Sequence, residues 1–73
     1  MNGRVALEVN GDTMDFADEQ APANLLKLME LLHLDPRMVV AEVNGDIVGR
    51  DAFAARDLGD GDKIELVKFV GGG

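Results

Sequence analysis

Hydrophobic and polar residues alternate along the first part of the chain, which is the pattern of strands with one buried face. One such stretch runs from Arg4 to Val9 and the next from Thr13 to Ala17. Between them, Asn10-Gly11 supplies the residue types that most readily take the two positive φ angles of a type I′ turn. We therefore expect an N-terminal β-hairpin.

The spacing of the apolar residues changes after a polar connection that contains Pro22. The next apolar residues recur at the spacing of one helix face: Leu25, Leu28, Met29 and Leu32. Asn24 suits the N-cap, because its side-chain oxygen can accept a hydrogen bond from the first turn. We expect Asp35-Pro36 to end this helix, since proline disfavours helical geometry at the residue before it.

The second half of the chain reads as three strands with one short helical turn among them. We expect a strand from Met38 to Val43, an Asn44-Gly45 turn, a short strand at Ile47-Val48, a helical turn at Asp51 to Arg56 that seats Phe53 on the core edge, and a last strand from Lys63 to Val70. This order of elements predicts a small α+β domain in which a mixed sheet of about five strands wraps one main helix.

The last strand carries apolar residues on both faces. Ile64 and Leu66 share the parity that would face the helix, whereas Val67 and Phe69 lie on the parity that would face solvent. Either a bulge shifts the register, or these two side chains are exposed beside the chain end. We favour an exposed patch that docks a protein partner.

The chain then ends in Val70-Gly71-Gly72-Gly73. Glycine loses more backbone freedom on ordering than any other residue, so three glycines after a strand do not serve stability. We divide the chain into a folded domain, residues 1–70, and a flexible glycine tail, residues 71–73. An extended tail without side chains can thread a narrow channel and present its carboxylate to another protein, although a frayed end is the competing interpretation.

The composition makes several classes of function and binding partner unfavourable. The 73 residues carry a net charge of −7, which disfavours nucleic-acid and membrane-surface partners. There is no cysteine and no phosphate-binding glycine loop, so the chain lacks an evident catalytic group of its own. We expect no metal site, because His33 is the only histidine and the Asp57, Asp60, Asp62 run lacks the pattern of a calcium loop. Without a signal peptide or an apolar span, we expect a cytoplasmic protein.

Several segments together resemble the ThiS sulfur carriers of thiamine biosynthesis, in register over nearly the whole chain. The segments that carry this resemblance are Leu34-Asp35-Pro36-Arg37, the Asn-Gly hairpin from Val43 to Val48, Arg50, Leu58 to Ile64 with Gly61-Asp62, and Val70 to Gly73. The chain departs from the family pattern at Gly49, where many relatives have proline, and at Phe53, where an aromatic residue, often tryptophan, is usual.

The resemblance implies a β-grasp, ubiquitin-like fold and a carrier that is not an enzyme. By position, Gly73 would be adenylated with ATP by a ubiquitin-activating-type partner (ThiF) and converted to a thiocarboxylate with sulfur from a cysteine desulfurase system. Thiazole synthase (ThiG) would then take the sulfur. Val70, Gly71 and Gly72 would thread the partner's channel. No cofactor would be bound, since ATP is used by the partner.

Two alternatives remain open from the sequence. In the first, the chain is a carrier for another pathway, such as the small subunit of molybdopterin synthase or a modifier that is conjugated to lysines. In the second, it is a ubiquitin-like interaction domain with an idle tail. A further hypothesis is electrostatic: the acidic side chains of Asp51, Asp57, Asp60 and Asp62 meet a basic surface on the activating enzyme.

Overall fold

The structure, a computed structural model, describes residues 3–70. The strands are β1 (Arg4–Val9), β2 (Asp12–Ala17), β3 (Val39–Val43), β4 (Asp46–Val48) and β5 (Lys63–Lys68). The helix α1 spans Leu25–Leu31, and three short 3-10 turns are η1 (Asp18–Gln20), η2 (Pro36–Met38) and η3 (Arg50–Ala52). The predicted strands and the predicted helix are all present, with shifts at their ends.

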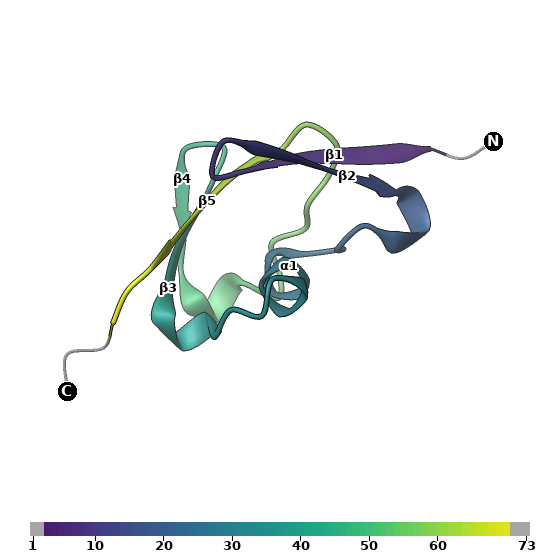
Figure 1. The fold of residues 1–73 in the computed structure, drawn as a ribbon. Helices are drawn as coiled ribbons and strands as arrows, with labels where there is room; N and C mark the ends of the chain where they lie inside the picture. The colour runs from purple at the N-terminus through teal and green to yellow at the C-terminus, as the bar shows by residue number, and fades with distance from the viewer. Residues whose placement is uncertain (1–2, 71–73) are drawn as a thin grey trace.

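The five strands form one mixed sheet in the order β2-β1-β5-β3-β4. The last strand in sequence, β5, therefore lies in the middle of the sheet, parallel to β1 and antiparallel to β3. Figure 1 shows the sheet curving over α1, with the β1–β2 hairpin above the helix and the β3–β4 hairpin at its side. The predicted α+β class, a mixed sheet around one helix, is confirmed.

Both Asn-Gly hairpin turns are confirmed. Asn10 and Gly11 have φ angles of 50° and 87°, and Asn44 and Gly45 have φ angles of 52° and 88°. Positive φ at both central residues is the signature of a type I′ turn, whose twist matches that of the flanking strands. After these turns, β2 begins at Asp12 and β4 begins at Asp46, each one residue earlier than predicted.

The core lies between the concave face of the sheet and α1. Its buried apolar residues are Leu7, Val9, Leu25, Leu28, Met29, Val39, Ala41, Val43, Phe53, Ile64 and Leu66. On β1, β3 and β5 these are the residues whose parity predicts an inward position. From the helix stripe, three of the four residues are buried, whereas Leu32 follows the end of α1 and packs only at the edge of the core.

The expected helix end is wrong, because α1 ends before Asp35-Pro36. It ends at Leu31, and His33 takes a left-handed conformation with φ of 59°. The N–H of His33 donates to the Glu30 carbonyl at 3.1 Å, and the N–H of Leu34 donates to the Met29 carbonyl at 2.9 Å. This pair of bonds is the Schellman motif, which usually places glycine where His33 stands.

Asp35 and Pro36 instead start the next element. An Oδ1 atom of Asp35 accepts a hydrogen bond from the Arg37 N–H at 2.9 Å, so Asp35 caps η2, with Pro36 as its first residue. Met38, which we expected in the third strand, is the last residue of η2, and β3 begins at Val39.

The short helical segment before the last turn starts at Arg50, one residue before its expected start, and is a 3-10 turn. Phe53 follows it and is 2% exposed, so this side chain belongs to the core itself. Gly49 precedes the turn with φ of −69° and ψ of 154°, angles that proline also adopts. Proline would therefore fit the backbone at this position without a change of its angles.

The last strand is shorter than predicted and has no bulge. Its pairing with β3 is continuous from Val43↔Ile64 to Val39↔Lys68. β5 ends at Lys68, and one further bond follows, from the N–H of Phe69 to the Met38 carbonyl at 3.0 Å. Val70, which we expected in the strand, lies beyond it. The register thus excludes a bulge as the reason for the outward parity of Val67 and Phe69.

Candidate docking surface and tail segment

The convex face of the sheet carries exposed apolar side chains beside the end of β5. Val67 is 58% exposed, Phe69 is 42% exposed, and Val40 of the neighbouring strand is 48% exposed. Val40 and Val67 are directly opposite each other in the antiparallel β3–β5 pair. We call these three residues the outer patch. The exposure predicted for Val67 and Phe69 is confirmed, and the sheet adds Val40.

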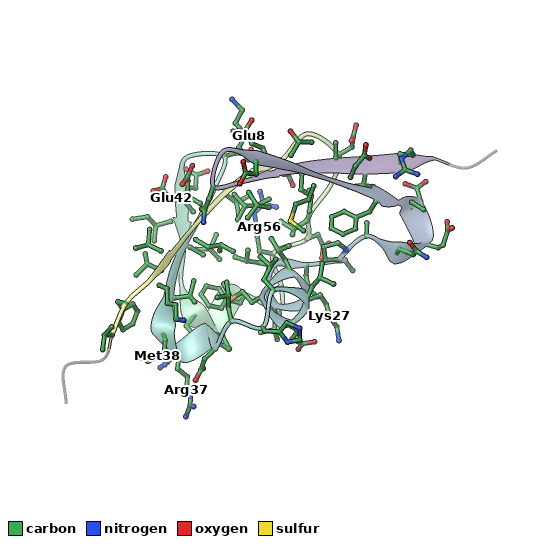
Figure 2. All side chains as sticks on the ribbon, in the orientation of Figure 1. Glu8, Lys27, Arg37, Met38, Glu42 and Arg56 are labelled. Carbon is green, nitrogen blue, oxygen red and sulfur yellow. The ribbon has the colours of Figure 1, made fainter. Side chains whose placement is uncertain are left out.

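The border of the outer patch is acidic on one side. In the row next to Val40 and Val67, Glu42 lies opposite Glu65, and Ile47 of β4 lies on the other side of Glu42. Like charges directly opposite each other on a sheet are destabilising, so this pair does not serve the fold. In Figure 2, Glu42 lies toward the hairpin turns and Met38 toward the end of β5. In the β3–β5 register, the Val40–Val67 pair lies between these two positions.

The start of β5 is held by two asparagine side chains, which we call the asparagine clamp (Asn10 and Asn44). The Asn10 carboxamide accepts from the Leu66 N–H at 2.7 Å and donates to the Leu66 carbonyl at 3.1 Å. Asn44 accepts from the Lys63 N–H at 2.9 Å and donates to Asp62 Oδ1 at 2.9 Å. Sequence reasoning assigned these residues to turns only and missed the clamp.

Two of the four acidic residues proposed for an electrostatic contact are engaged within the fold. Asp60 Oδ1 accepts from the Ala6 N–H at 2.7 Å, and Asp62 Oδ2 accepts from the Gly59 N–H at 2.8 Å. Partial burial acts to raise the pKa of Asp62, but the hydrogen bonds from Asn44 and Gly59 and the nearby charge of Arg56 together lower it. Asp51 and Asp57 are exposed.

The opposite end of β5 leads to the tail. Val70 is 92% exposed. The predicted sites Gly71, Gly72 and Gly73 lie outside the described residues. Figure 2 places Arg37 and Met38 at the end of the molecule where β5 finishes.

Three exposed basic residues lie on or close to this end: Arg37, Arg50 and Lys68. Hydrogen bonds from the Arg37 side chain and N–H lower the pKa of Asp35 to about 2, and the charge of Arg50 acts in the same direction.

Residues 3–70 contain no group of three histidine, cysteine, aspartate or glutamate side chains arranged to hold a metal ion. Over the same residues the structure has no pocket, and no helix is long and apolar enough to cross a membrane. His33, considered above as a metal ligand and rejected, forms the end of α1.

Comparison with known proteins places these features in a family. The model of the ThiS family matches residues 7–73, a range that includes the glycine tail. The sulfur carrier protein ThiS of Bacillus subtilis is 31% identical over 67 residues, which cover 92% of this chain and 98% of the relative. A crystal structure of the thiamine biosynthesis protein ThiS from Geobacter metallireducens matches with a TM-score of 0.75 and 34% identity, over 94% of this chain and 100% of that one.

A longer relative matches as well. A thiazole synthase of Paramagnetospirillum magneticum is 37% identical over 67 residues, 92% of this chain. This chain spans only 20% of that protein's length. The structural match confirms the β-grasp fold, and the family match covers nearly every residue. The chain belongs to the ThiS family of sulfur carriers.

Proposed function

We propose that this protein is a sulfur carrier of thiamine biosynthesis whose functional group is the carboxylate of Gly73. The observation that carries this proposal is the family match, which extends over residues 7–73 and so includes the glycine tail. The exposed Val70 supports it, because the chain leaves β5 without side-chain contacts that would hold it against the domain.

The chemistry proceeds in three steps. A carboxylate is a poor acyl donor, so an oxygen of the Gly73 carboxylate first attacks the α-phosphate of ATP and releases pyrophosphate. A persulfide sulfur of the donor then attacks the carbonyl carbon of this acyl adenylate and displaces AMP, which gives an acyl disulfide. A thiol attacks the donor sulfur of this acyl disulfide, so the S–S bond breaks, a new disulfide forms on the donor and the thiocarboxylate is released. The catalytic groups, and the ATP site, belong to a ThiF-type adenylating enzyme, and the sulfur comes from a cysteine desulfurase system.

The outer patch is the proposed docking surface for the adenylating enzyme. Exposed apolar side chains that cluster on one face are typical of protein-binding sites. Val67 and Phe69 lie directly before the tail, so an enzyme that covers them also receives the tail. Three extended residues reach about 10 Å at roughly 3.3 to 3.6 Å each, which suffices to pass through the wall of a neighbouring protein.

The proposed acceptor of the sulfur is a thiazole synthase. The Paramagnetospirillum magneticum protein of that name contains a segment similar to almost all of this chain. Two functions that are joined in one polypeptide in one organism are often carried out by two interacting proteins in another. A separate thiazole synthase is therefore a candidate partner of this chain. The names of the relatives favour thiamine over the molybdopterin pathway considered above.

Genetic complementation tests the proposal. A bacterial strain that lacks its own ThiS requires thiamine or its thiazole precursor, and we expect this chain to restore growth without either. A variant that lacks Gly73 should not restore growth. The control is Lys27→Ala, on the face of α1 away from the sheet (Figure 2), which should behave as the natural sequence.

Growth supported equally by the variant without Gly73 would show that the tail is idle. If the folded natural sequence restores no growth while the strain's own carrier does, the thiamine assignment is wrong for this chain.

A further inference from the structure

The backbone of β5 presents its hydrogen-bonding groups alternately to its two neighbours. Odd-numbered residues bond to β3: the Lys63 carbonyl accepts from the Asn44 N–H, and the Phe69 N–H donates to the Met38 carbonyl. Even-numbered residues face β1: the Ile64 carbonyl accepts from the Asn10 N–H, and both backbone groups of Leu66 bond to the Asn10 side chain. This alternation directs the backbone groups of Lys68, the last residue of β5, toward the β1 side.

The β1 side of β5 is open beyond Leu66. β1 pairs with β5 only through Glu8↔Lys63 and Val9↔Ile64, and then turns away at Asn10-Gly11. The Asn10 carboxamide extends this edge by one residue, to Leu66. The backbone groups of Lys68, the last residue of β5, face this side, and within residues 3–70 no strand lies on this side of Lys68 or of Val70.

We propose that the enzyme that adenylates the tail binds this open edge by adding an extended strand of its own next to Lys68 and Val70. The inference rests on the function proposed above and specifies how the tail is recognised. In this complex the added strand occupies the side of β5 that β1 leaves free. It bonds to the N–H and carbonyl groups of Lys68 and Val70.

The composition of the tail favours recognition through the backbone. Gly71, Gly72 and Gly73 offer no side chains, so only their N–H and carbonyl groups can position them. Strand addition uses those groups and gives affinity through main-chain hydrogen bonds.

The position of the edge favours the adenylating enzyme as the occupant over a second copy of the chain. The edge lies directly before the carboxylate that must enter an active site, and it is continuous with the outer patch on Val67 and Phe69. Two copies would bring together chains that each carry a net charge of −7. The exposed bases Arg37, Arg50 and Lys68 at this end instead suit an approach to the anionic phosphates of bound ATP.

Site-resolved amide hydrogen exchange tests the inference directly. It is measured on the carrier alone and with the adenylating enzyme present in excess. We expect the Lys68 and Val70 amides to exchange at least tenfold more slowly in the complex. The Phe69 amide, already bonded to Met38, serves as the internal reference and should change less. Binding without slower exchange at Lys68 and Val70 would overturn the inference and leave the proposed function standing.

A matched pair of variants gives an independent test. Lys68→Pro removes the N–H that faces the open edge, whereas Lys68→Ala removes only the side chain. Proline is tolerated where the N–H of an edge position faces solvent. We expect both variants to fold, and Lys68→Pro to bind the enzyme at least tenfold more weakly than Lys68→Ala. Equal affinities would contradict strand addition.

If Lys68→Pro does not fold, the pair Val70→Pro and Val70→Ala replaces it, because Val70 lies outside β5. A carrier that does not bind the enzyme at all would overturn the proposed function and this inference with it. Slower exchange at Lys68 and Val70 that appears in the free carrier as its concentration rises would assign the edge to a second copy instead.

Discussion

The two ends of β5 differ in how the rest of the molecule holds them. At the start, the asparagine clamp and the β1 backbone bond to the strand from both sides, and Ile64 is 1% exposed. At the end, β5 keeps a partner only on the β3 side, and Val67 is 58% exposed. One strand thus combines a fixed anchor with a surface that is free to bind.

This difference explains how a small domain can present a reactive chain end. The strand that leads to the tail is central in the sheet, so the origin of the tail is fixed in space. Residues 67–70 are exposed, so a partner can reach them without unfolding the domain. Stability and binding are assigned to different residues only a few positions apart.

The largest difference between the two ends should appear in stability. We expect Ile64→Ala to lower the free energy of unfolding by about 2–5 kcal/mol, because it leaves a cavity in the core. A surface change such as Val67→Ala should stay within about 0.5 kcal/mol. Urea unfolding measures both. Since a domain of this size has about 4–11 kcal/mol in total, the loss in Ile64→Ala is a large share of its stability. Equal losses for the two variants would show that the ends of β5 are held alike.

The clamp should account for the next largest effect. Asn10→Gly keeps the positive φ of the turn but leaves both backbone groups of Leu66 without the Asn10 partner. We expect a loss of about 1–3 kcal/mol, the usual penalty for unmatched polar groups that are partly buried. The matched variant at the open end is Val70→Gly, which should change the unfolding free energy by less than about 0.5 kcal/mol. If Asn10→Gly is neutral in urea unfolding, the clamp does not hold the strand.

Binding should show the reverse order. We expect Val67→Ser to weaken association with the adenylating enzyme by about tenfold, or 1.4 kcal/mol, while its unfolding free energy changes little. Leu31→Ser is the control, because Leu31 is 48% exposed but lies on α1, away from the outer patch. Calorimetry or surface plasmon resonance gives the affinities. A loss as large for Leu31→Ser would place the docking surface elsewhere.

The smallest effect concerns pH at the fixed end. The pKa of Asp62 is lowered from its ordinary value of 3.8 in the folded state, so its ionised form stabilises the fold. This contribution is present above pH 3.8 and is lost as the pH falls through the lowered pKa. We expect Asp62→Asn to be less stable than the natural sequence at pH 7, by about 0.2–1 kcal/mol, and the difference to shrink below pH 3.8. A difference that stays constant from pH 7 to pH 2.5 would contradict this.

Most of the fold could be predicted from local sequence patterns. The strands and their inward faces follow from the alternation around Leu7, Ala41 and Ile64, because period-two patterns depend only on neighbouring residues. The outward parity of Val67 and Phe69 likewise pointed to the outer patch. These features required no knowledge of which strands pair.

Two features were beyond such patterns. The helix end at His33 was missed because the left-handed residue of a Schellman motif is usually glycine, and histidine gives no comparable signal. The clamp was missed because Asn10 and Leu66 are 56 positions apart, so their contact depends on β5 inserting between β1 and β3. The sequence pattern of an Asn-Gly turn is the same whether or not the asparagine side chain bonds to another strand.

The central claim, that β5 is a fixed base for a reactive Gly73 carboxylate, is tested most directly by intact mass spectrometry. The purified chain is incubated with its adenylating enzyme, ATP and a sulfur source. We predict that its mass rises by the difference between one sulfur and one oxygen atom, and that fragmentation assigns the gain to Gly73. Two results would contradict the account. One is an unchanged mass of this chain with an adenylating enzyme that is active on its natural carrier. The other is a mass gain that fragmentation assigns to a residue other than Gly73.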